Sequence, residues 1–440
     1  MITRFSFRTV LPISKCLPEP IASIRGVSGT QKLTPWKENR MLCFGVTTWI
    51  KPLLLLPFTS MAQTLNIKAT LLWLPNPDPI PLPAPVWLFK TLHILTLSLH
   101  FTTVHLVIGG LLIGLVWNFL GRRDPGSHYA QASNEIASRL PIVMTFLINF
   151  GVPPLLFTQV LYGRAIYTSS ILIGAYWISV IFLLMAGYFL LYQCAKHAET
   201  KRPWWLHGIT ALVLLGFIAR IYTTNFTLML RPVVWLDLYR ADALGTTLPG
   251  GDPTILPRWL FMMVASLAFT GVALLLLGQN TPQLTSPVSK FLTRAGALVA
   301  AVTLPIQFLI GYWVLQVQPF TVRTELGQAQ FYHIAMTGWP VLLFLTLISA
   351  LLANRFRMLA YGSALFGFLT VSVSVIVRDG IRDFTLMENG FNVWHQVVVP
   401  NWQIVILFLT LFVAGLATIG WLVNIAMSAK NEEGVAHTHV

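Results

Sequence analysis

The chain has little charge for its length. Of its 440 residues only 10% are Asp, Glu, Lys or Arg, while 55% are apolar, and the mean hydropathy is +0.70. A soluble domain carries about 25% charged residues. One core cannot bury so much apolar surface, so lipid must surround most of this chain. The composition excludes a soluble enzyme, a nucleic-acid-binding protein and a disordered chain. It predicts that the chain is embedded in a lipid bilayer.

Cysteine is also scarce. Cys16, Cys43 and Cys194 are the three cysteines, and the sequence contains neither a CxxC nor a CxxCH motif. This excludes a disulfide framework, a zinc site of the paired-cysteine type and covalently attached haem c. Any c-type haem must therefore belong to a partner subunit.

The beginning of the chain is typical of targeting and processing segments. Residues 1–40 hold seven Lys or Arg and two acids without a hydrophobic period, which predicts a basic N-terminal extension that reflects an over-long start. Met41 opens a second start, and an apolar run and a small-x-small site make 41–62 a candidate signal peptide. A transit peptide followed by a short anchor is the alternative.

The remainder is predicted to be an all-α integral membrane protein of about nine transmembrane helices. Every second residue from Pro75 to Pro85 is proline, so 63–86 is expected to be an extended outer segment. The membrane domain covers 87–426, and 427–440 is an inner C-terminal tail. Apolar runs of about bilayer length lie at 87–119, 140–163, 170–194, 205–226, 259–278, 295–316, 331–353, 358–378 and 402–426.

The net charge of +14 is distributed over loops and tails, which is typical of membrane topology. With the first span starting outside, the inner loops hold eleven Lys or Arg and the outer segments hold seven. This excess predicts an N-out, C-in orientation. The loop 227–257 is then an outer surface where a partner could dock.

Ionisable residues inside a bilayer are costly, so each one is a candidate site. The first span holds His93, His100 and His105. His93 and His100 are seven residues apart and share one helix face, whereas His105 is rotated away from it. Because the two axial ligands of a haem lie on opposite sides of the ring, the span is expected to flank one or two haems that other helices complete. The plainer alternative is that each histidine only hydrogen-bonds a neighbouring helix.

Other ligands and cations cluster near the predicted outer ends. Met262 begins the fifth span, and His333 and Met336, three residues apart, begin the seventh; methionine can ligate haem, although in a membrane helix it usually packs. Arg220 lies within the fourth span, and Arg378 and Arg382 flank the end of the eighth. These last cations form a set of candidate haem-propionate partners. Snorkelling to lipid headgroups is the alternative for Arg378 and Arg382.

Carboxylates are expected to be absent from all nine spans. Asp379 and Asp383, for example, fall beyond the apolar run of the eighth span and are expected at a helix end. A proton pump or oxygen reductase normally needs a buried carboxylate relay. The sequence therefore argues against these two activities and leaves redox chemistry without proton delivery open.

Several stretches, in order along 86–426, resemble subunit I of the cytochrome bd quinol oxidase family. The segment 99–101, with Leu106 and Gly109, is similar to the first-helix motif whose histidine ligates high-spin haem b. Segments 151–163, 264–266 and 336–338 are similar to motifs of the second, fifth and seventh helices. The resemblance implies haem b, in one or two copies, with His100 as iron ligand and Met336 as a low-spin ligand.

The departures from this family bear on function. Gln159 stands where the family has a glutamate, and Met262 where it has a low-spin haem histidine. The outer quinol-binding loop is reduced to about 317–330, and no carboxylate matches the eighth-helix one near the oxygen-reducing haem. The resemblance therefore implies an electron-transfer protein that does not reduce oxygen and whose use of quinol is weakened.

A divergent, non-oxidase branch of the superfamily that works with multihaem c-type cytochromes is the nearest likeness. Residues 79–87, Arg378 with Arg382, and 399–402 look like that branch. The resemblance implies a respiratory oxidoreductase subunit in the bacterial inner membrane that exchanges electrons with a c-type cytochrome and with quinone as a further partner.

Two other readings stay open. The first is a haem-free membrane anchor for a periplasmic redox partner, which the loss of family residues favours. The second is a secondary transporter with His93 and His100 along its path; the absence of inverted repeats and of acids in the spans argues against it.

Overall fold

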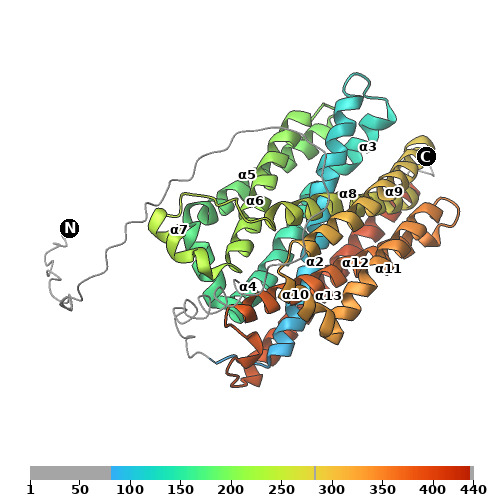
Figure 1. The fold of residues 1–440 in the computed structure, drawn as a ribbon. Coiled ribbons are helices and arrows are strands. Elements are labelled where there is room, and N and C mark those ends of the chain that lie inside the picture. The colour runs from blue at the N-terminus through green and yellow to red at the C-terminus, as the bar shows by residue number, and fades with distance from the viewer. Residues whose placement is uncertain (1–80, 282–283, 437–440) are drawn as a thin grey trace, which may run out of the picture. The chain divides into compact units, whose positions relative to one another are not determined.

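The computed structural model describes residues 81–281 and 284–436, all within the unit Ser60–Val440. The predicted basic extension, the candidate signal peptide and most of the proline-rich segment lie outside these residues. The described part is helical throughout, apart from short connections (Figure 1).

The helices follow one another as antiparallel hairpins. Their bounds are α2 Val86–Gly121, α3 His128–Ala137, α4 Leu140–Leu172, α5 Gly174–Glu199, α6 Trp205–Leu228, η2 Pro232–Val234, α7 Trp235–Ala241, α8 Ile255–Asn280, α9 Ser286–Gln316, α10 Phe320–Gln328, α11 Gln330–Leu352, α12 Met358–Glu388, η3 Val393–His395 and α13 Trp402–Ala436.

Each of the nine predicted spans lies on a separate helix. Within the described residues eight helices are long and apolar enough to cross a bilayer, and α13 is apolar over Trp402–Thr418. This confirms an all-helical, multi-pass membrane protein. The N-out orientation stays a prediction, and the helical backbone of α13 continues through most of the expected C-terminal tail.

Two helices extend well beyond their apolar runs. α4 continues to Leu172, with a kink at Tyr162, and α12 continues to Glu388. Polar side chains occupy the added turns, so a hydropathy window ends before the helix does. The α12 extension brings charged residues into the bundle, as described below.

α2 is the central helix of the bundle and packs against α3, α4, α6, α8 and α12 (Figure 1). The approach to α8 is closest at Gly109, where an added Cβ would overlap the carbonyl oxygen of Ser266. The backbones can meet there only because glycine has no side chain. Thr270 of α8 donates a hydrogen bond to the His105 carbonyl at 3.2 Å beside this contact.

The two ends of the bundle differ. One end carries α3 and the connection 353–357; the other, called here the α10 end, carries α7, α10 and the segment 389–401. At the α10 end the extended residues 81–85 precede α2, and Leu82 bridges to Val398. In the predicted orientation the α10 end faces outward.

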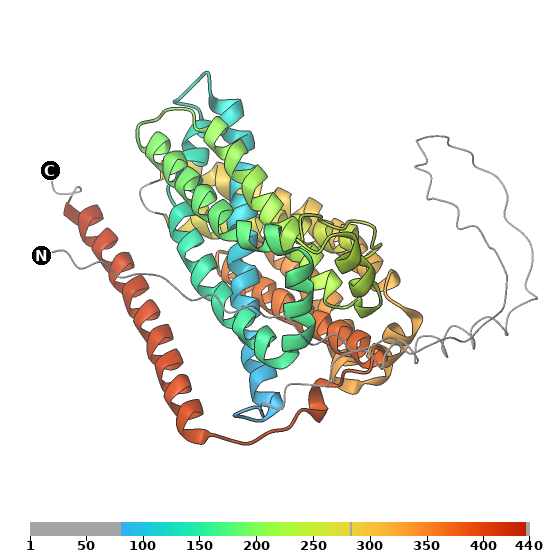
Figure 2. The same cartoon turned by 90° about the vertical axis from the view of Figure 1, so that its left-hand side faces the viewer.

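α13 lies apart from the other helices (Figure 2). Most of its described side chains are exposed, and Phe408 contacts Phe157 of α4 at 6.0 Å between ring centroids. The bundle proper is therefore formed by α2–α12.

We predict that Gly109→Ala destabilises the bundle, because the new methyl group forces α2 and α8 apart. Thermal unfolding of the purified protein in detergent should show a lower Tm. Gly338→Ala is the matched control, since a Cβ at Gly338 in α11 meets no atom within 4 Å. Equal Tm values for the two variants would contradict the close α2–α8 contact.

Candidate functional site

A cluster of buried ionic side chains joins α2 to α12 near the α10 end. Lys90 of α2 forms ion pairs with Asp379, at 2.5 Å, and with Asp383. The two aspartates are four residues apart and so lie on one face of α12. All three side chains are at most 5% exposed. Taking charges out of water is costly, and this pairing offsets much of that cost.

Two tyrosines complete the hydrogen bonds of the carboxylates. The Tyr162 hydroxyl donates to Asp383 Oδ1 at 2.6 Å, and the Tyr332 hydroxyl donates to Asp379 Oδ2 at 3.3 Å. Lys90 also donates to the Tyr162 oxygen at 3.1 Å. Tyr162 sits at the kink of α4, so the non-helical turn there places its hydroxyl in the cluster.

Arg382 is the second cation of the cluster. It pairs with Asp379, lies 4.1 Å from the Tyr162 ring centroid, and contacts His93 Nε2 at 3.1 Å. The other nitrogen of His93, Nδ1, lies 3.1 Å from the carbonyl oxygen of Pro154. A carbonyl only accepts and a guanidinium only donates, so the His93 proton is on Nδ1. Both nitrogens of His93 are therefore engaged by protein atoms.

These positions correct the expectation that acids are absent from the spans and that Arg378 and Arg382 flank a helix end. Asp379, Arg382 and Asp383 lie inside α12 and are buried, at 2%, 5% and 3% exposure. The sequence reasoning ended the span at 378, where the hydropathy falls. The signal it missed is helical spacing: Lys90 and His93 are three residues apart on one helix, and Asp379 is three and four residues from Arg382 and Asp383 on another. Each set therefore shares one helix face.

His93 and His100 face the same neighbour, as their spacing predicts. His100 Nδ1 lies 3.0 Å from the Leu147 carbonyl of α4, two turns from the Pro154 carbonyl that His93 contacts. A Cβ at Gly151 would come within 2.8 Å of the His100 ring, so glycine lets the ring lie against α4. Among the described residues, none hydrogen-bonds His100 Nε2. That nitrogen carries the lone pair, because Nδ1 must donate to the carbonyl.

His105 faces α8 instead, again as predicted. Its Nδ1 lies 3.2 Å from the Ser266 hydroxyl, and its ring stacks on Phe269 at 5.3 Å. The three histidines of α2 thus serve two different interfaces.

Arg378 of α12 lies beside aromatic rings of α2 and α6. Its guanidinium carbon lies 5.6 Å from the Phe101 ring centroid and 5.0 Å from that of Phe226. The Phe101 ring in turn lies beside His100, with the two ring centroids 5.9 Å apart. Arg258 contacts the Thr227 hydroxyl at 3.4 Å. Phe101 thus lies between the positive charge of Arg378 and the His100 ring.

The other sequence candidates are dispersed. His333 is exposed on α11, whereas Met336 packs against the apolar cluster of α10 and α12. Met262 is half-buried on α8, and its carbonyl accepts a hydrogen bond from Ser266 at 2.7 Å. Arg220 donates to Thr224 and, at 3.1 Å, to the Pro249 carbonyl. Arg220 therefore anchors the loop between α7 and α8.

An ion pair outside the spans joins Asp252 of that loop to Arg231, which follows α6, at 2.7 Å. Burial raises the pKa of Asp252. The hydroxyl of Thr254 and the charge of Arg231 lower it by more than burial raises it, so the pKa lies below its usual value. This pair and the Arg220 contact fix the loop over the α10 end.

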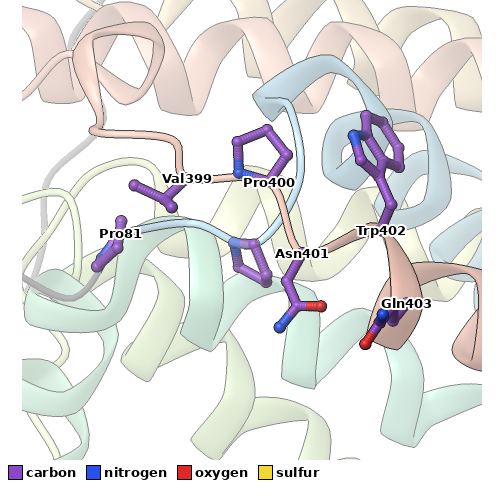
Figure 3. Close-up of a pocket in the computed structure, with 7 residues that line it drawn as sticks. Pro81, Val399, Pro400, Asn401, Trp402 and Gln403 are labelled. Atoms are coloured by element: carbon purple, nitrogen blue, oxygen red, sulfur yellow. The ribbon is translucent and has the colours of Figure 1, made fainter.

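A shallow groove opens where two extended segments meet (Figure 3). Val399 N–H donates to the Leu82 carbonyl at 2.9 Å, and Asn401 N–H donates to the Pro83 carbonyl at 2.8 Å. The structure thereby brings together parts of the segments 79–87 and 399–402, which are far apart in the sequence. Trp394, in the same connection, lies 5.6 Å from Lys90 Nζ and covers the ionic cluster.

Neither a protein-family model nor a curated protein matches the chain. Within the described residues, no group of three or more His, Cys, Asp or Glu is arranged to hold a metal ion. His100 combines an Nδ1 held by the Leu147 carbonyl with an Nε2 that no described residue hydrogen-bonds.

Lys90→Met should destabilise the protein by about 3–5 kcal/mol, because it leaves two buried carboxylates with one cation. Adding Asp383→Asn to Lys90→Met should recover part of this loss by removing a charge of each sign. Chemical unfolding in detergent measures both, with the exposed Lys196→Met as the control. A Lys90→Met variant as stable as the parent would show that the cluster does not hold the helices.

Asp252→Asn should lower the Tm at pH 7. The Tm difference between the variant and the parent should become smaller as the pH is lowered. A carboxyl with a lowered folded-state pKa stabilises the protein above its unfolded pKa of about 3.9, and this stabilisation is lost as the pH falls through the folded value. Thermal unfolding between pH 7 and pH 3 tests the sign, with the exposed Asp237→Asn as control. A Tm difference that grows toward low pH would contradict the assignment.

Proposed function

We propose that the chain is the membrane subunit of a respiratory electron-transfer complex in the bacterial inner membrane. In this proposal it binds haem b at His100 and exchanges electrons with a c-type cytochrome partner at the α10 end. The observation that supports it most is the arrangement of His100: Nδ1 is held by the Leu147 carbonyl, and Nε2 is left without a protein hydrogen bond. Metal-ligating histidines are typically oriented in this way.

The surroundings of His100 fit a haem ligand in two further respects. Gly151 leaves room for the His100 ring against α4, where the Leu147 carbonyl fixes its direction. Arg378, over the Phe101 ring next to His100, supplies a positive charge suited to the propionates of the porphyrin. When bound, haem supplies one-electron redox chemistry, and the chain orients it and sets its potential through ligand, charge and burial.

His93 has a different part in this proposal. With both nitrogens engaged, it stabilises Arg382 and hence the register of α12 beside α2. We therefore do not propose His93 as an iron ligand. The prediction that Met336 or Met262 supplies a second ligand stays open, and one haem is the number that the contacts of α2 support.

Oxygen reduction is not part of the proposal. Gln159 cannot take up a proton where the family resembled here has a glutamate. The buried acids that the structure adds, Asp379 and Asp383, each accept hydrogen bonds from Lys90 and a tyrosine, and Asp379 also pairs with Arg382. Because these ion pairs and hydrogen bonds hold both carboxylates in place, we assign them a structural part in this proposal.

The α10 end is the docking face in this proposal. The loop fixed by Arg220 and Asp252, together with the groove at 399–403, presents backbone, arginine and aromatic groups there. A c-type cytochrome on this face would bring its haem to the end of the bundle nearest His100. Quinone stays a further candidate partner.

A secondary transporter is the second candidate, and one observation favours it more than the sequence did: ionisable side chains are buried within the spans. Substrate-dependent uptake into vesicles that lack a redox partner would support this candidate. The haem-free anchor differs from the proposed haem protein in having no visible absorption from haem.

The purified protein should give a b-type signal in a dithionite-reduced minus air-oxidised spectrum, with about one haem per chain by pyridine haemochrome. His100→Ala should abolish most of this signal, since it removes the iron ligand. His333→Ala is the control, because His333 is exposed on another helix. A folded but colourless protein would overturn the proposal in favour of a membrane anchor.

A further inference from the structure

A small, partly enclosed cavity lies where α2, α8, α9, α11 and α12 meet. Its polar lining residues are His105 of α2, Gln307 of α9, and Thr370 and Ser374 of α12, while the remaining wall, including Trp339 of α11, is aromatic or aliphatic. The centre of a water-sized sphere can occupy about 10 Å³ there. About that volume is needed to hold one water molecule.

The hydrogen bonds of His105 determine which of its nitrogens carries a proton. Ser266 donates its hydroxyl proton to the Met262 carbonyl at 2.7 Å. The Ser266 oxygen must therefore accept from His105 Nδ1, 3.2 Å away. This leaves His105 Nε2 unprotonated, as a hydrogen-bond acceptor in a side chain that is 3% exposed.

Gln307 adds a second acceptor. Its Oε1 atom is buried without a hydrogen-bond partner, and the side chain is 2% exposed. Thr370 and Ser374 contribute no free proton, because their hydroxyls donate to the carbonyls of Phe366 and Val371, both at 2.7 Å. His105 Nε2, the hydroxyl oxygens of Thr370 and Ser374, and Gln307 Oε1 are thus hydrogen-bond acceptors.

We infer that the cavity is a binding site for one water molecule that donates its two protons to His105 Nε2 and Gln307 Oε1. Water is the neutral molecule of this size that offers two donors, and an unsatisfied acceptor inside a membrane protein is costly. The bridge joins α2 to α9 in the core of the bundle. It stands on the cavity and its acceptors and does not depend on haem at His100.

The sign of a stability change tests this inference. If water bridges the two groups, Gln307→Leu leaves His105 Nε2 unsatisfied and lowers the Tm. If the cavity is dry, Gln307→Leu removes an unsatisfied acceptor and raises the Tm or leaves it unchanged. The second result would overturn the proposal, and Gln159→Leu, a half-buried glutamine on α4, is the control for the substitution itself.

A double-mutant cycle measures the coupling between His105 and Gln307. His105→Leu should lower the Tm less in the Gln307→Leu background than in the parent, because the shared water is already lost. Additive losses would contradict a shared ligand. If Gln307→Leu does not fold, Gln307→Met, with a flexible side chain, replaces it in the cycle.

The identity of the occupant is tested directly by cryo-electron microscopy of the full chain in nanodiscs at a resolution that shows water. We expect a peak within hydrogen-bond distance of both His105 Nε2 and Gln307 Oε1. Tm values in sodium, ammonium and choline chloride should agree. A site without a peak, or a Tm shift specific to one cation, would overturn the assignment to water.

Discussion

The structure depends on one interaction, the buried pairing of Lys90 and Arg382 with Asp379 and Asp383. The four charges sum to zero, and in lipid they can be tolerated only when they lie together. α2 and α12 therefore have one register in which all the charges are paired. Tyr162 extends the same constraint to α4 through its kink, and Tyr332 extends it to α11.

This register also determines the geometry of the candidate haem site. Arg378 directly precedes Asp379 on α12, so fixing the carboxylate fixes the position of the arginine beside Phe101 and His100. His93, bonded to Arg382, and His100 contact carbonyls two turns apart on α4. The ionic cluster thus has a supporting part: it positions the histidine and the cation that we propose to bind the cofactor, and it has no redox role of its own.

Hydropathy and helical spacing were sufficient to predict the helices and the faces of the three histidines. They were insufficient for the cluster, because hydropathy treats Asp379 and Asp383 as the end of a span, whereas their partners, Lys90 and Tyr162, come from distant parts of the chain. Arg220 was predicted to meet a cofactor; the structure adds a contact that the sequence does not predict, with the Pro249 carbonyl of the loop between α7 and α8. Such pairings depend on tertiary contacts that one sequence does not reveal.

The central claim is that His100 ligates a haem whose charge is balanced by Arg378 of α12. The most direct measurement is a redox titration of the haem in the parent and in Arg378→Gln. A positive charge near the haem stabilises its reduced form, so the account predicts a lower midpoint potential in the variant. An unchanged potential would show that Arg378 does not face the haem, and a protein without haem would contradict the account as a whole.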